Sequence, residues 1–265
     1  DNPGYWPVWD AILRDLVVKE PNITLYLNTE GKKAVMKGPT KIEGVLVENV
    51  LSKKQFYLKA DIFIDSTGDG VVAHSAGAIY RMGREARNEF DESLAPIEAD
   101  DCVLPATITY SVRDVGRPVP FTPPSWAKDF PSDENLPGRH HGGEGNLGSF
   151  WWMEYGGTLN MIDDHDKIWD ELMKIAYGMW DHIKNHGDHG ASNFVMDWVG
   201  LVVAKRESRR IIGDYILTQN DVMSQRLFPD RVAYGGWPID LHVPKGIYAK
   251  TPTPYEASVG LPGLY

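Results

Sequence analysis

Residues 61–78 constrain the fold more than any other stretch of this sequence. Three consecutive apolar residues, Ile62, Phe63 and Ile64, favour a strand buried on both faces of a parallel sheet. The chain then turns through residues 66–70 (STGDG), where two glycines allow positive φ angles and close approach of the backbone to a ligand. Small residues follow and favour a short helix. This order is typical of an anion-binding edge of an α/β sheet, although a tight turn without a ligand explains the same pattern.

Size and charge exclude several classes of protein. A chain of 265 residues is long enough to bury one large core or two modest ones. Its formal net charge of -10 argues against nucleic acids and anionic membranes as partners, because both require a basic surface. No apolar run approaches the length of a membrane span. The compartment, cytoplasmic or periplasmic, and the oligomeric state stay open.

The single cysteine, Cys102, limits the redox and metal chemistry of the chain. It excludes an internal disulfide framework and any metal site built from several cysteines. Asp100 and Asp101 precede it, and their negative charges would raise the pKa of the thiol. We therefore expect Cys102 to be a poor nucleophile.

The first sixty residues combine one helix with several strands. Apolar residues at helical spacing predict a helix over residues 7–19, and residues 23–28 read as a strand. Alternating apolar residues separated by turn residues predict a three-stranded meander over residues 33–38, 42–50 and 55–60.

From about residue 97 the pattern changes to short strands, a long loop and one long helix. Residues 103–112 and 149–157 read as strands, and residues 116–148 read as a proline-rich loop. A wide apolar face predicts a helix over residues 164–186, with Asp163 or Asp164 as its cap. Further predictions are mixed apolar character over 191–203, a short helix after Thr218 with Asp221 near its start, a strand over 231–234 and irregular structure over 244–265.

Several runs of sequence resemble one known family. The runs are residues 61–70, 77–87, 92–96, 152–157, 180–185, 205–215 and 233–240. Together they resemble a bacterial family of FAD-dependent oxidoreductases, flavoproteins of the type with two dinucleotide-binding domains. Ala204 departs from the family pattern, which tends to have glycine before the lysine of the run at 205–215.

The resemblance implies a mixed α/β fold in which FAD is the cofactor. Residues 1–96 would form the second half of a Rossmann-like FAD-binding domain with its β-meander. Residues 97–243 would form a β-rich substrate domain with one long helix, and residues 244–265 an irregular C-terminal segment. The glycine-rich motif GxGxxG of such a domain is expected after a strand and before a helix. The formal match at residues 143–148 instead follows a polar, proline-bearing loop and precedes a strand-like run, so we expect a fragment that lacks the N-terminal motif segment and a C-terminal segment.

The resemblance and the residue chemistry together predict the site. The glycine turn, with Ser66, Thr67, Gly68, Asp69 and Gly70, would contact FAD, and so would Arg84. Catalytic roles are predicted for Arg206, Arg209 and His242, because a histidine transfers protons near neutral pH and arginine forks bind hydroxyl-rich or carboxylate ligands. Substrate contacts are predicted for Arg210, Glu207, Trp152, Glu154 and Trp237.

Each of these assignments has a structural alternative. The cluster over residues 205–210 also reads as a set of ion pairs, and the tryptophans, Trp151 included, also read as core residues. His182 and His186 have the spacing of helical metal ligands, but their helix ends at once and the HExxH pattern is missing. We therefore expect no metal site.

The predicted function is hydride transfer between FAD and a small, sugar-like hydroxy compound, as part of carbohydrate metabolism. One alternative is a substrate- or carbohydrate-binding domain without flavin. Another is a carbohydrate-binding or lyase-type protein that uses arginines and aromatic residues.

Overall fold

The computed structural model describes residues 6–142, 147, 148, 150–233, 235, 239–250, 255 and 256. The chain divides into two compact units, Asp1–Ile79 and Tyr80–Tyr265, and this division falls before the boundary predicted after residue 96. In the described residues the strands form one three-stranded and four two-stranded sheets, and every pairing is antiparallel. The predicted mixed α/β character is confirmed, whereas the described part of the chain contains no Rossmann-like parallel sheet.

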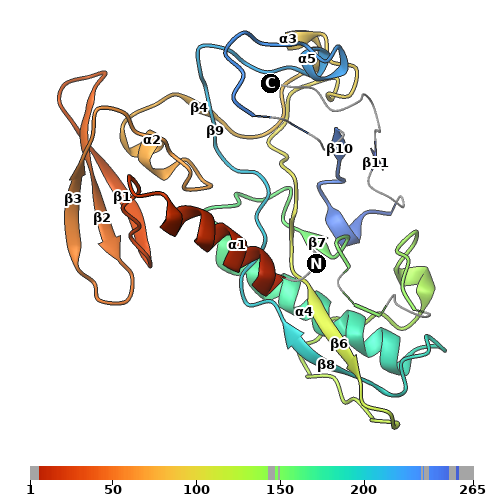
Figure 1. The fold of residues 1–265 in the computed structure, drawn as a ribbon. Helices are drawn as coiled ribbons and strands as arrows, with labels where there is room; N and C mark the ends of the chain where they lie inside the picture. The colour runs from red at the N-terminus through yellow and green to blue at the C-terminus, as the bar shows by residue number, and fades with distance from the viewer. Residues whose placement is uncertain are drawn as a thin grey trace. The chain divides into compact units, whose positions relative to one another are not determined.

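The first unit contains the predicted helix and the predicted meander (Figure 1). Helix α1 spans Trp6–Lys19, and its apolar side chains from Val8 to Val18 are largely exposed. The meander consists of β1 (Thr29–Met36), β2 (Ile42–Asn49) and β3 (Gln55–Lys59) in the order β1-β2-β3. These elements follow from local sequence signals, so α1 and the meander are confirmed with small shifts of their ends.

A short helix, α2 (Val71–Ser75), covers one face of the meander. Val72 of α2 is buried with Ala34, Val45 and Val47. The Ser75 hydroxyl donates to the Val72 carbonyl oxygen and accepts a hydrogen bond of 2.8 Å from the Ala34 backbone N–H. Helix α2 is therefore held against the meander by a buried valine and a side-chain hydrogen bond, and the short helix predicted after the glycine turn is confirmed.

Two predicted strands of this unit do not form. Residues 23–28 are irregular and exposed, and residues 61–66 are also outside any strand. Ile62 and Ile64 are 81% and 89% exposed, so the predicted burial on both faces is wrong for this chain. A strand requires neighbours for its backbone N–H and C=O groups, and no described residue pairs with this segment.

The second unit is built from pairs of short strands. The pairs are β4 (Tyr80–Arg81) with β9 (Arg210–Ile211), β5 (Ala106–Thr107) with β7 (Glu154–Tyr155), β6 (Tyr110–Asp114) with β8 (Phe194–Val199) and β10 (Asp240–Leu241) with β11 (Tyr255–Glu256). The predicted strand over residues 103–112 is divided, because β5 and β6 have different partners. The aromatic strand predicted over residues 149–157 is reduced to β7.

The long helix α4 (His165–Asn185) organises the core of the second unit. Its buried residues, Ile168, Leu172, Ile175, Met179 and Ile183 among them, match the predicted apolar face. Figure 1 shows α4 beside β6 and β8, and the Tyr110 ring of β6 contacts Trp180 of α4 with 6.0 Å between ring centroids. Asp164 occupies the N-cap position but makes no capping hydrogen bond through its side chain, so the predicted cap is only positional.

The remaining elements are short. They are α3 (Arg87–Phe90), the 3-10 helix η1 (Asp133–Asn135), α5 (Gln219–Met223) and the 3-10 helix η2 (Gly246–Tyr248). The short helix predicted after Thr218 is confirmed, and the Thr218 side chain caps it by accepting from the Asp221 backbone N–H. Residues 231–233 are irregular where a strand is predicted.

Candidate active site

The glycine turn at residues 66–70 is organised by Asp65. Its carboxylate accepts hydrogen bonds from the Thr67 N–H at 3.0 Å, the Thr67 hydroxyl at 2.6 Å and the Ala73 N–H at 2.8 Å. The Thr67 hydroxyl oxygen in turn accepts from the Val71 N–H at 2.7 Å. Burial opposes ionisation of Asp65, but these hydrogen bonds prevail and lower its pKa. A charged Asp65 therefore holds the turn in one conformation.

The turn is open to an approaching group on its glycine side. Gly68 and Gly70 have φ angles of 82° and 62°, which side chains rarely adopt, and a Cβ built on Gly68 meets nothing within 4 Å. Ser66, Thr67 and Gly68 are exposed. These residues fit a cofactor whose phosphate or ribose passes close to backbone, so the turn could hold part of FAD.

Arg84 has a partner within its own unit. Its guanidinium forms a fork on the Asp100 carboxylate, with an Nε–Oδ1 distance of 2.9 Å and a second ion pair through Nη2. Arg84 also lines a cleft of the second unit. Its predicted contact with FAD stays a prediction.

This cleft, of about 620 Å³, brings together several of the predicted site residues. Arg84, Glu207 and His242 line it, together with Glu85 and Asp240. The remaining walls are largely apolar and include Leu94, Val103, Leu104, Leu217, Val222 and Ile239. A cleft of this volume, with apolar walls and a few polar groups, has the size and character of a small-molecule site.

His242 is held between two carboxylates beside the cleft. Its Nδ1 lies 2.7 Å from Glu154 Oε1, and its Nε2 lies 2.8 Å from Asp240 Oδ2. Arg206 completes the cluster, because its Nη1 lies 2.8 Å from Glu154 Oε1 and 3.0 Å from both ring nitrogens of His242. The His242 and Glu154 side chains are only 2% and 4% exposed, whereas that of Asp240 is 30% exposed. We call these four residues the His242 cluster.

The surroundings of His242 favour its protonated form. Burial opposes the charge, but the hydrogen bonds with Glu154 and Asp240 outweigh it and raise the pKa of His242. A proton is thus kept on a ring that contacts two carboxylates and the edge of a cleft. This arrangement suits proton transfer near neutral pH.

Arg210 and Glu207 join separate segments of the second unit. Arg210 donates to the carbonyl oxygen of Gly83 at 2.6 Å and to Glu85 at 2.8 Å, and it also pairs with Glu207. Glu207 accepts from the Leu104 backbone N–H at 2.9 Å. These contacts support the structural alternative of ion pairs for Arg210, while Glu207 still lines the cleft.

The aromatic candidates separate into core and site. Trp152 is buried and stacks on Phe150 with 4.7 Å between ring centroids, so its side chain belongs to the core rather than to a substrate wall. Trp151, its neighbour, is 44% exposed and its ring lies edge-on to His242 at 5.7 Å. Trp237 lies outside the described residues. The guanidinium of Arg209, a predicted catalytic residue, lies over the Tyr80 ring, 5.5 Å from the ring centroid.

Sequence reasoning missed Asp240 and Glu85 as members of the site. Asp240 stands in the run 233–240 and precedes His242 by two residues, so its side chain and that of His242 share one side of an extended chain. This spacing could have indicated that Asp240 accompanies His242 in the site. Glu85 offered no such signal, because only the tertiary contact with Arg210 brings it to the cleft.

Cys102 behaves as its acidic neighbours predict. Burial and the charge of Asp100 raise the pKa of the thiol, and Arg84 offsets this only in part. The predicted rise of the thiol pKa is confirmed, and the poor nucleophilicity expected from it stays a prediction.

His182 and His186, which have the spacing of helical metal ligands, contact different partners. His186 Nε2 lies 3.2 Å from Asp181 Oδ2. His182 instead faces Asp133, His141 and His189, which come from other segments. Sequence spacing alone pointed to the wrong partner.

Comparison with known proteins identifies the family. The family model described as FAD dependent oxidoreductase matches residues 6–262, so the chain belongs to this family. FAD is accordingly its cofactor, and its general function is that of an oxidoreductase acting on a small molecule. Neither the curated proteins nor the solved structures contain a significant match. Within the described residues, no helix is both long and apolar enough to cross a membrane.

Proposed function

We propose that the protein transfers hydride between FAD and an alcohol group of a neutral, polyhydroxylated substrate such as a sugar derivative. The observation that carries this proposal is the His242 cluster, a protonatable ring held between two carboxylates at a cleft. Oxidation of an alcohol releases a hydride and a proton. The cluster provides a destination for the proton.

The charge of the cleft supports a neutral substrate. Its ionisable lining consists of four carboxylates, Glu85, Glu92, Glu207 and Asp240, and two cationic groups, Arg84 and His242. Arg84 is already paired with Asp100, so the cleft offers little to an anion. Carboxylate oxygens accept hydrogen bonds from hydroxyl groups, which favours a polyol over a phosphate or a carboxylate.

Asp240 is the member of the His242 cluster that a substrate reaches first, because its side chain is the most exposed of the three groups around the ring. We assign it the proton of the substrate hydroxyl group. His242 contacts both carboxylates and, when its ring is neutral, takes up the proton from Asp240, so that the proton ends on the ring. Arg206 holds the Glu154 carboxylate in place through an ion pair of 2.8 Å. Reduction of a carbonyl group uses the same groups in the opposite direction.

When bound, FAD supplies the acceptor for the hydride. Ser66, Thr67 and Gly68 are assigned to its phosphate or ribose, because the turn is exposed there and leaves room beside Gly68. We also propose, from the family resemblance, that the protein is bacterial and acts in carbohydrate metabolism.

Kinetics of flavin reduction tests the proposal. We expect Asp240→Asn and His242→Gln to lower the rate of anaerobic flavin reduction by a neutral polyol by about 10²–10⁴-fold, with a smaller effect on substrate affinity. Asp170→Asn, on the exposed side of α4, is the matched control and should keep the rate of the unmodified protein. Faster reduction by hydroxy acids than by polyols would contradict the assigned substrate class.

A second candidate is a polyol-binding domain without redox activity. The pairing of Arg84, Arg206 and Arg210 inside the chain favours it, because arginines committed to ion pairs are structural elements. Calorimetric titration of flavin-free protein with polyols distinguishes the two candidates. Binding together with absence of flavin reduction at every pH supports the binding domain.

A further inference from the structure

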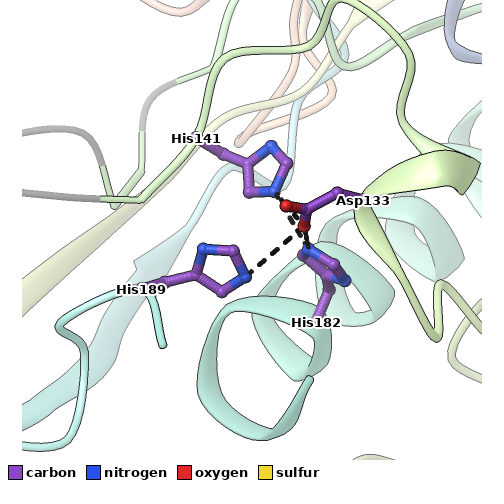
Figure 2. Close-up of side chains that lie close together, drawn as sticks. All are labelled: Asp133, His141, His182 and His189. Carbon is purple, nitrogen blue, oxygen red and sulfur yellow. Dashed lines mark hydrogen bonds and ion pairs between the residues drawn. The ribbon is translucent and has the colours of Figure 1, made fainter. Parts of the chain in front are cut away.

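Four potential metal ligands meet at one point of the second unit, away from the His242 cluster in sequence and sharing no residue with it. Figure 2 shows Asp133, His141, His182 and His189, whose ligand atoms all lie within 4.8 Å of one another. Asp133 begins η1, His182 belongs to the last turns of α4, and His141 and His189 come from loops. We call these residues the three-histidine cluster.

Hydrogen bonds fix which nitrogen of two of these histidines carries a hydrogen. His182 Nδ1 lies 2.7 Å from the Phe130 carbonyl oxygen, and His141 Nδ1 lies 2.6 Å from the Arg139 carbonyl oxygen. A carbonyl oxygen only accepts, so both Nδ1 atoms donate. In the neutral rings the Nε2 atoms are therefore acceptors with free lone pairs.

These lone pairs point at one another and at a carboxylate. The two Nε2 atoms of His141 and His182 are 2.9 Å apart. Asp133 Oδ1 lies 3.3 Å from the first and 3.0 Å from the second. Three acceptors at such distances repel one another unless a positive charge lies between them.

We propose that the three-histidine cluster binds one divalent first-row transition metal ion, with zinc as the expected ion. Neutral imidazole and carboxylate groups are ligands that zinc favours, and bond lengths near 2.1 Å in a tetrahedral site place neighbouring ligand atoms about 3.4 Å apart. The distances among Asp133, His141 and His182 lie close to this value. A bound cation also removes the repulsion among the three acceptors.

His189 is the ligand that has to adjust most. Its Nε2 lies 3.8 Å from Asp133 Oδ1 and 3.2 Å from the His186 carbonyl oxygen. Two glycines make room for its ring. A Cβ on Gly142 would lie 2.6 Å from His189 Nδ1, and one on Gly187 would lie 2.9 Å from His189 Nε2.

The surroundings hold the other ligands in place, as outer contacts do in metal sites. The His182 side chain is fully buried, and its ring is anchored to the Phe130 carbonyl oxygen. Ser132 and Asn135 close the turn that presents Asp133, with Ser132 N–H donating to Asn135 Oδ1 at 3.1 Å. Asp133 and His182 are therefore positioned before any ion arrives.

Four protein ligands would fill a tetrahedral coordination sphere, so we assign the ion a structural role. It would join residues 133–141 to α4 and to the loop that follows it. The described residues of the long loop 116–148 contain only η1 as regular structure, so few backbone hydrogen bonds hold this loop. A metal ion would fix this loop to α4.

The test measures metal content and thermal stability. After dialysis against EDTA and incubation with zinc sulphate, followed by desalting, we expect one zinc per chain by mass spectrometry and a higher Tm than for the EDTA-treated protein. Asp133→Ala removes an exposed ligand, and His189→Gln removes a ligand at a loop. Each should weaken zinc binding by at least about tenfold and abolish the rise in Tm. His186→Gln is the matched control, because His186 neighbours the cluster and pairs with Asp181 instead.

Other outcomes decide against the site. The proposal is overturned if folded protein, as judged by circular dichroism, retains no zinc and its Tm does not respond to zinc. Equal loss of zinc in His186→Gln and His189→Gln also overturns it. Magnesium should not be retained, because imidazole ligands disfavour this hard cation. These readouts do not involve flavin or activity, so they are independent of the proposed function.

Discussion

Replacement of Glu154 by glutamine tests the electrostatics of the His242 cluster. The Glu154 carboxylate is 4% exposed and lies within 2.8 Å of both Arg206 and His242. Glu154→Gln keeps the shape of the side chain and removes its charge. Two cationic groups are then left with one fewer buried partner.

The size of the effect follows from burial. Removing one partner of a buried ion pair typically costs 3–5 kcal/mol, because the other charge stays buried and unpaired. His242 keeps its contact with Asp240, and the Arg206 side chain is 26% exposed. We therefore expect a loss at the lower end, about 3 kcal/mol in the free energy of unfolding.

The effect depends on pH with a defined sign. The pKa of His242 is raised in the folded protein above its ordinary value of about 6.5. Its contribution to stability is therefore complete below about pH 6.5 and is lost as the pH rises through the folded pKa. Glu154→Gln removes a contact that raises this pKa. As the pH rises from about 6.5, the free energy of unfolding should therefore decrease less in the variant than in the unmodified protein.

Urea denaturation followed by tryptophan fluorescence, between about pH 5.5 and about pH 9, measures both quantities. Asp170→Asn is the control, because the Asp170–Lys174 pair is exposed and contributes little. A loss no greater than that of the control, or the same pH dependence in Glu154→Gln and the unmodified protein, would refute the reasoning.

Three further predictions concern other parts of the chain. Gly178→Ala in α4 should destabilise the fold by about 1–3 kcal/mol in thermal or urea unfolding, because the added Cβ would lie 2.1 Å from the Lys128 carbonyl oxygen; an unchanged Tm would contradict this. Burial opposes ionisation of Asp221, but hydrogen bonds, led by that with Tyr215, hold its pKa at about 2. Stability from this carboxylate should be present above about pH 4 and lost as the pH falls towards 2, and Asp221→Asn should remove this part of the acid denaturation profile. Gly68→Ala should weaken FAD binding in equilibrium dialysis, because the φ angle of 82° disfavours alanine; unaltered retention of flavin would exclude the turn from the cofactor site.

Elements with strong local signals were predictable from the sequence. Neighbouring residues determine the helical spacing in α1 and α4, the alternation in the meander and the start of α5 after Thr218. The glycine turn belongs to the same group, since positive φ angles are a property of single residues.

Elements that depend on distant pairing partners were not predictable from the sequence. Residues 23–28 and 61–66 have the composition of strands, but a strand forms only when its backbone groups find neighbours. The predicted strand over 103–112 is divided because Ala106 and Thr107 pair with β7, while Tyr110 and the following residues pair with β8. The alternation of apolar and polar residues within one segment does not show which other segment pairs with it.

The site shows the same division. Arg206, Glu154 and His242 were chosen from the sequence for their chemistry, and the structure brings these three together. Their fourth partner, Asp240, was missed, as was the three-histidine cluster, since tertiary contacts assemble Asp133 and His141 with α4. Trp152 was preferred to Trp151, although only burial distinguishes them.

The pH dependence of anaerobic flavin reduction shows whether the His242 cluster takes up the proton of the substrate. The FAD-loaded protein is mixed with a neutral polyol in a stopped-flow instrument, and the rate is compared with that of His242→Gln. We expect the rate in the unmodified protein to follow an ionisation above about pH 6.5. In the variant this ionisation should be absent and the rate lower by at least about 100-fold. Equal rates and equal pH profiles would contradict the assignment of the His242 cluster as the proton-transfer site.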